Sequence, residues 1–180
     1  KDVKRKSIRK SQATTGKLAI IGIDYADVRD FASAGVLTID DDGNHKWRQH
    51  TWICAESPYL SSIKFPIDNA GQAGFRDFEV VRSATIPIGN IVNWCEDRMK
   101  EYQVVKITMD TYRYTLFKTI FEERSISIET KDNPQGMVRL LRKIGSVCGI
   151  IAPTIEKLFS EHLIDYGDSA IMRWYTQNTG

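Results

Sequence analysis

The chain has 180 residues, 42% apolar and 27% charged, which is enough for one domain with a sizeable core. No apolar run approaches the roughly 20 residues of a membrane span, and the N-terminus lacks the apolar stretch of a signal peptide, so we expect no membrane contact. The three cysteines are far apart and include no Cys-x-x-Cys pair, which argues against a disulfide framework or a zinc site and favours a reducing cytosol.

Basic residues are concentrated at the start of the chain. The formal net charge is only +2, yet residues 1–17 contain seven lysines and arginines against a single acid, Asp2, so the rest is mildly acidic. A basic leader suits a segment near a polyanion, and a solvated linker explains it equally well. We treat residues 1–16 as a linker and 17–180 as the domain. Because the chain opens on Lys1, we also expect it to be a piece of a longer protein.

The first half of the chain reads as a meander of strands. Residues 17–24 form an apolar run of strand length that ends in an acid, the pattern of a strand buried on both faces. Residues 31–39 and 45–53 are two further strand candidates, and the turn formers at 40–44 make them an antiparallel hairpin. Residues 58–88 contain prolines and glycines that break any regular pattern, so we expect an extended loop there.

The second half changes to alternating helices and strands. Apolar residues fall at helical spacing over 88–102, and a short buried strand is expected over 104–109. The expected elements after that are a helix over 111–123, a strand over 125–129 and helices over 135–147, 153–163 and 169–177, with Pro153 in the first turn of its helix. This order predicts an α/β fold, with a mixed β-sheet flanked by helices and the later strands parallel to the first.

Two of the buried strands end in an aspartate, Asp24 and Asp110. Functional groups in open α/β sheets gather at the carboxyl ends of parallel strands, so these carboxylates converge if the strands are neighbours. Converging carboxylates repel each other unless a cation lies between them, and hard oxygen ligands favour Mg²⁺ or Mn²⁺. Either aspartate alone would be read as a solvated loop residue. The repeated pattern therefore indicates a divalent metal site.

The segments around these acids resemble a known family. The run Gly22-Ile-Asp24-Tyr-Ala-Asp-Val-Arg-Asp30 is similar to the opening of the nuclease domain of phage terminase large subunits, in which the first aspartate is a metal ligand. The run Val104-Val-Lys-Ile-Thr-Met-Asp110-Thr-Tyr resembles the family segment that supplies the second ligand. The resemblance therefore implies metal-binding roles for Asp24 and Asp110. It leaves open whether Asp30 assists.

The end of the chain carries the most specific part of the resemblance. Tyr166-Gly-Asp168-Ser-Ala-Ile-Met-Arg-Trp174 is similar to the family's last turn and helix. Tyr166 stands where the family usually has a histidine and Ala170 where it has a proline. The resemblance implies that Asp168 is the third ligand, although an aspartate before a helix is also a natural N-cap. Asp165 aligns with a variable position and should be dispensable.

Taken over residues 17–180, the resemblance implies a ribonuclease H-like fold and a DNA endonuclease that cuts concatemeric double-stranded DNA during genome packaging. It implies two Mg²⁺ or Mn²⁺ ions held by Asp24, Asp110 and Asp168. The implied partners are a packaging ATPase domain of the same polypeptide, a small terminase subunit and a portal, in the host cell cytoplasm. No phosphate-binding GxxxxGK[ST] loop is present. A Holliday-junction resolvase, a ribonuclease or a non-catalytic binding module of this fold are the alternatives.

Overall fold

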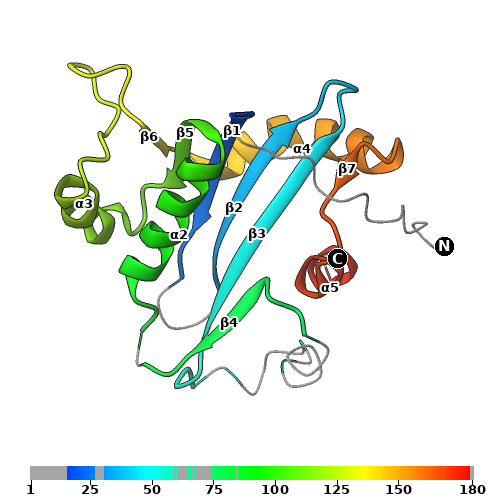
Figure 1. The fold of residues 1–180 in the computed structure, drawn as a ribbon, viewed down its shortest axis with the longest axis horizontal. Helices are drawn as coiled ribbons and strands as arrows, with labels where there is room; N and C mark the ends of the chain where they lie inside the picture. The colour runs from blue at the N-terminus through cyan, green and yellow to red at the C-terminus, as the bar shows by residue number, and fades with distance from the viewer. Residues whose placement is uncertain are drawn as a thin grey trace.

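A mixed β-sheet with helices on both faces forms the framework of the chain. The computed structural model describes residues 16–26, 31–58, 60, 65, 67, 74–83 and 85–178. Within these residues the strand order is β4-β3-β2-β1-β5-β6, and β7 pairs with β3 (Figure 1). The elements are β1 (Leu18–Asp24), β2 (Ala32–Ile39), β3 (His45–Cys54), β4 (Phe78–Val81), α2 (Ile88–Glu101), β5 (Gln103–Asp110), α3 (Tyr114–Glu123), β6 (Val138–Leu141), α4 (Ile144–Ser160), β7 (Ile164–Asp165) and α5 (Ala170–Asn178).

The predicted meander is confirmed for the first three strands. β1 pairs antiparallel with β2, and β2 pairs antiparallel with β3 in register from Ala32–Trp52 to Ile39–His45. The turn between β2 and β3 is stabilised by Asp40, whose Oδ1 accepts the backbone N–H of Asn44 at 2.9 Å, and by Gly43, whose φ of 81° few other residues adopt. The hairpin follows from these turn residues together with the alternating strands.

Parallel strands occupy the other side of β1. β5 pairs parallel with β1, and β6 pairs parallel with β5, as crossovers through α2 and then α3 predict. The strands β1, β5 and β6 therefore end at the same edge of the sheet. This arrangement brings Asp24 and Asp110 to one edge.

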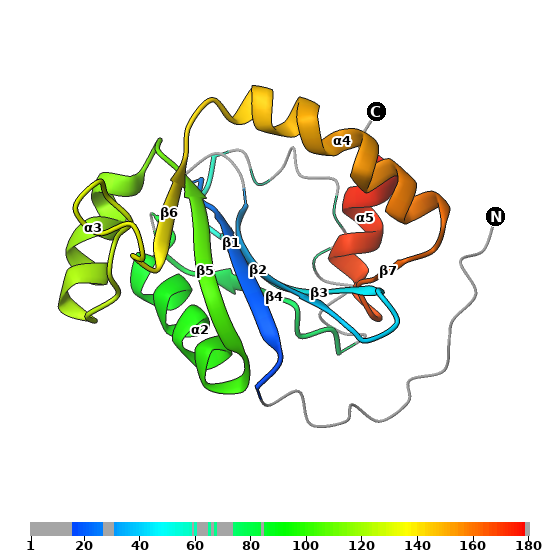
Figure 2. The same ribbon diagram turned by 90° about the horizontal axis from the view of Figure 1, so that it is seen from above.

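One face of the sheet is covered by α2 and α3, and the opposite face by α4 and α5 (Figure 2). The first face holds the main core. Its fully buried side chains include Ile21, Val36 and Ile107 of the sheet, Ile91 and Cys95 of α2, and Phe117 and Phe121 of α3. Alternate residues of each strand point to this face because the side-chain period of a strand is two.

The opposite face is covered less evenly. α5 packs on β3 and β4 through a second core cluster that contains Ile53, Ile171, Phe31 and Trp174. Over β1 and β2 the indole of Trp47 takes the space beside Gly35, where a Cβ atom would overlap its ring. α4 leaves apolar side chains open to solvent, with Ile150 77% exposed. None of the described helices has the length and apolarity that a bilayer span requires.

Four expectations about local structure are corrected. Residues 138–141 form strand β6, where a helix over 135–147 was expected, and α4 starts at Ile144 and runs through Pro153, which lies in its interior. The expected strand at 125–129 is reduced to one bridge between Ile128 and Val138. β4 lies within the stretch expected to be irregular. Periodicity alone fails here because short apolar runs suit strand and helix alike.

Candidate functional site

Asp24 and Asp110 lie on neighbouring strands at the same sheet edge. Ile23 of β1 is in register with Met109 of β5, and both are buried in the main core. The next residue of each strand is an aspartate, which therefore points to the opposite face. Asp24 is exposed and Asp110 is half-buried, so solvent reaches the pair. The two carboxylates that the sequence predicted to converge are thus placed side by side by the strand register.

Hydrogen bonds fix the backbone around Asp110. Its Oδ1 accepts the backbone N–H of Tyr112 at 3.0 Å, which closes a turn directly after β5. Two residues earlier, the Thr108 hydroxyl donates to the carbonyl oxygen of Ile21 at 3.2 Å and joins β5 to β1 across the same face. These bonds orient the Asp110 carboxylate and strengthen the pairing of the two strands that carry the acids.

A row of polar side chains leads across the sheet to Asp24. Ser33 is in register with Asp24, and its hydroxyl oxygen lies 3.0 Å from the hydroxyl oxygen of Thr51. Thr51 accepts a hydrogen bond from the Gln49 amide at 3.5 Å, and the Trp47 Nε1–H donates to Gln49 at 3.1 Å. Sequence reasoning missed this row. The alternation of β2 and β3 could have placed these residues on one face, but the function of a polar face cannot be read from alternation alone.

Asp168 lies apart from the other two acids. It precedes α5, and its Oδ1 accepts a hydrogen bond from Arg173 Nη1 at 2.6 Å. The next residue, Ser169, donates to the carboxylate of Asp77, which directly precedes β4. The acid therefore lies near β3 and β4, whereas Asp24 lies on β1, two to three strands away, which amounts to about 10 to 15 Å at the usual strand spacing.

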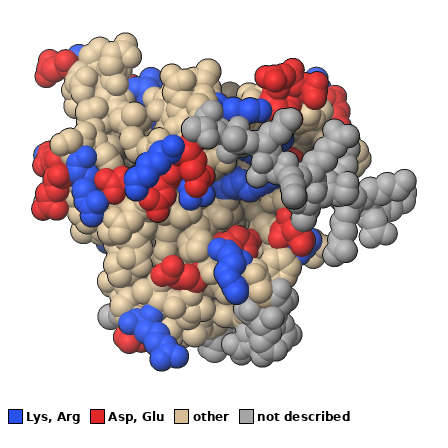
Figure 3. Space-filling model, viewed as in Figure 1, with Lys and Arg blue, Asp and Glu red and all other residues tan. Residues whose placement is uncertain are grey.

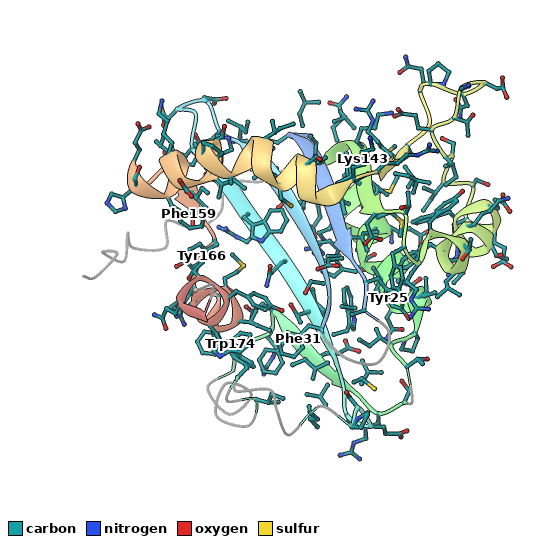
Figure 4. All side chains as sticks on the ribbon, turned by 180° about the vertical axis from the view of Figure 1, so that it is seen from behind. Tyr25, Phe31, Lys143, Phe159, Tyr166 and Trp174 are labelled. Atoms are coloured by element: carbon teal, nitrogen blue, oxygen red, sulfur yellow. The ribbon has the colours of Figure 1, made fainter. Side chains whose placement is uncertain are left out.

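The surroundings of Asp168 form a shallow pocket of about 170 Å³, lined by Arg48, Gln49, Phe75, Arg76, Asp77, Tyr166, Gly167, Asp168 and Ser169. Arg48 donates to the carbonyl oxygen of Asp165 at 3.0 Å and pairs with its carboxylate. Asp165, in β7, thus has its structural partner Arg48 on β3, and it pairs with the start of β3 at Lys46, far from Asp24. Figure 4 shows α5 with Trp174 directed towards Phe31, with ring centroids 5.9 Å apart.

The donor set suits a hard divalent cation only in part. Two adjacent carboxylates at an exposed edge offer the oxygen ligands that Mg²⁺ and Mn²⁺ prefer. Within the described part of the chain, however, no group of three or more His, Cys, Asp and Glu side chains is placed to hold a metal. Asp27 and Asp30 lie outside the described residues. The structure therefore brings together two of the three predicted ligands.

Charges of both signs are interspersed over the face seen in Figure 3. Near the β5 end of the sheet, Lys106 and Arg139 both pair with Glu129, at 2.6 Å and 3.0 Å. The hydrogen bond from Lys106 is the largest cause of a lowered pKa of Glu129. The hydrogen bond from Arg139 and the charges of both cations lower it further. The described basic residues here are thus largely engaged by acids.

Comparison with known proteins identifies the fold. The structure matches the crystal structure of the HK97 bacteriophage large terminase with a TM-score of 0.69 and 14% sequence identity, over 86% of this chain and 31% of that chain. The chain thus spans about a third of the length of the terminase that it matches. No protein-family model and no curated protein sequence matches the chain. The likeness confirms the expected ribonuclease H-like α/β fold and the structural resemblance to a phage terminase large subunit.

Proposed function

We propose that the chain is a metal-dependent DNA endonuclease domain of a phage terminase large subunit, which cuts concatemeric DNA during genome packaging in the host cytoplasm. The observation that carries the proposal is the pair Asp24 and Asp110, which the register of β1 and β5 sets side by side at the carboxyl edge of the sheet. Parallel α/β sheets place their functional groups at this edge. The fold of the matched terminase supports the same assignment.

Asp24 and Asp110 would hold the metal. Bound Mg²⁺ or Mn²⁺ supplies a water nucleophile of lowered pKa and stabilises the charge on the leaving oxygen of a phosphodiester. The protein's own part is to hold the carboxylates in place, as the Tyr112 N–H does by donating to Asp110 Oδ1. Without a cation the two carboxylates repel each other, so the fold itself gains little from keeping both.

Asp168 stays our predicted third ligand. Its present partner is Arg173, so ligation requires Asp168 to exchange that ion pair for the metal and the segment before α5 to approach Asp24. The substitutions Asp165→Asn and Asp168→Asn test this. We expect only Asp168→Asn to reduce cleavage and the rise in melting temperature that Mn²⁺ binding produces. Full activity and full metal stabilisation of Asp168→Asn would remove Asp168 from the ligand set and leave the Asp24–Asp110 pair untouched.

The assembly around the domain follows from the same proposal. The matched terminase chain is about three times as long as the region shared with this chain. We propose that a packaging ATPase domain belongs to the same polypeptide and that a small terminase subunit and a portal are its partners. Double-stranded DNA is the substrate.

Nicking of supercoiled plasmid tests the proposed activity. The domain is incubated with Mg²⁺ or Mn²⁺, each with and without a chelator. We expect relaxed and linear products that the chelator abolishes and that show little sequence preference. Plasmid that stays supercoiled in both metals over a wide range of enzyme concentration would contradict the proposal and favour a non-catalytic module. Preferential cutting of four-way junctions or of RNA would point to a resolvase or a ribonuclease of the same fold.

A further inference from the structure

The turn that follows Asp110 exposes an aromatic ring. Tyr112 is 69% exposed, and the next most exposed of the described Phe, Trp and Tyr residues is Phe159, at 38%. A single exposed apolar residue is ordinary on a protein surface and calls for no function. Tyr112 differs from such a residue in its place, two positions after a candidate metal ligand, and in the group that lies over its ring.

The guanidinium carbon of Arg113 lies 4.6 Å from the centre of the Tyr112 ring. This is a cation–π contact, which holds the ring in one orientation and places a positive charge beside it. Because the guanidinium covers one face of the ring, the exposed area belongs to the other face and to the edges. The turn thus presents a flat aromatic surface backed by a cation.

A nucleotide next to a phosphate at Asp110 would lie within reach of the Tyr112 ring. The backbone N–H of Tyr112 donates to Asp110 Oδ1, so the ring and the carboxylate belong to one closed turn. Two residues span at most about 7 Å, and nucleotides repeat every 3.4 Å or so along one strand of a duplex. A phosphate held at Asp110 would therefore have a neighbouring nucleotide within reach of Tyr112.

We propose that Tyr112 is a positioning residue on which a nucleotide flanking the scissile phosphate stacks, and that Arg113 backs this contact with positive charge. The inference rests on the proposed nuclease function. Aromatic rings stack on any base, so the contact adds affinity without sequence preference. A base inside a duplex already has neighbours on both faces, so stacking requires an unpaired or terminal nucleotide. The domain should therefore favour DNA that is unpaired beside the cut.

Binding is measured first without metal, so that the result does not depend on cleavage. Fluorescence anisotropy at low salt, with a chelator present, compares a labelled single strand with a blunt duplex for the wild type, Tyr112→Ala, Tyr112→Phe and the control Phe159→Ala. Phe159 lies at the C-terminal end of α4. The other end of this helix begins just after Lys143, close to the end of β6 (Figure 4). We expect Tyr112→Ala to weaken binding of the single strand about tenfold, and Tyr112→Phe and Phe159→Ala to bind as the wild type does.

Cleavage provides the second measurement. With Mn²⁺ present, Tyr112→Ala should raise KM for partly single-stranded DNA by a similar factor and leave kcat nearly unchanged, and Tyr112→Phe should restore the wild-type KM. Equal binding of the single strand by the wild type and Tyr112→Ala, or no binding by either protein, would overturn the stacking role. If Tyr112→Ala binds the single strand as the wild type does, and the wild type cleaves normally, only this inference is refuted. If Tyr112→Ala weakens single-strand binding as expected, but the wild type cuts no DNA, only the nuclease function is refuted.

Discussion

The two faces of the sheet are covered in different ways. Under α2 and α3 the side chains interlock, and Cys95, Phe117 and Phe121 have no exposed area. On the opposite face α4 keeps Ile150, Ile151 and Ile155 exposed, and the candidate site lies at the edge of this same face. The difference teaches that the two faces pack unequally: the face under α2 and α3 holds the main core, whereas the face of the candidate site has a smaller core cluster under α5 and exposed apolar side chains on α4.

Truncation of one phenylalanine on each face measures this difference directly. Phe117→Ala removes a fully buried ring and should lower the free energy of unfolding by about 3 to 5 kcal/mol, because it loses both burial and packing. The matched change on α4, Phe159→Ala, should cost about 1 kcal/mol or less. Urea unfolding of both variants checks the prediction. Equal losses would show that α4 is packed as tightly as α3.

Thiol labelling compares the two helices at a smaller scale. Cys148 on α4 is exposed, whereas burial raises the pKa of Cys95 on α2 to about 12 from the ordinary 9.0, so its thiolate is scarce at pH 8. We expect Cys148 to react at least about a hundredfold faster than Cys95, which reacts only after local opening. Comparable rates would contradict the packing of α2.

The same pKa shift predicts a pH dependence. The folded state holds the Cys95 proton more tightly than the unfolded state, so the stabilising effect is fully present below pH 9 and is lost as pH rises towards about 12. Replacement by Ala should flatten the fall in unfolding free energy above pH 9. An unchanged slope in Cys95→Ala would show that other groups cause the alkaline loss.

Sequence reasoning predicted the strands and helices that have strong local signals. β1, β2, β3, β5 and α2 were found because their apolar periods are long and their ends carry turn residues or acids. The region after residue 124 was predicted less well. β6 has only four residues, and its strand state depends on pairing with β5, which no local pattern encodes. Pro153 suggested a helix start, yet a proline inside a helix costs about 3 kcal/mol and does not forbid one.

The candidate site was predicted in the same uneven way. Asp24 and Asp110 follow from two buried strands and one parallel pairing, so local pattern and topology agree on their place. The position of Asp168 depends on where α5 packs, and this is decided by contacts of Ile171 and Trp174 with residues far away in the chain. Tyr112 gave no signal in sequence because its exposure and its contact with Arg113 are products of the turn.

The central claim is that Asp24 and Asp110 together make a metal-dependent nuclease centre. The most direct test is the rate of Mn²⁺-dependent plasmid nicking by Asp24→Asn and Asp110→Asn, with Asp97→Asn as control, because Asp97 lies on α2 and pairs with Lys100. We predict that both strand-end variants fall to the rate seen with chelator while their melting temperatures without metal equal or exceed that of the wild type, and that Asp97→Asn cuts normally. Wild-type nicking by a folded Asp24→Asn or Asp110→Asn would contradict the account.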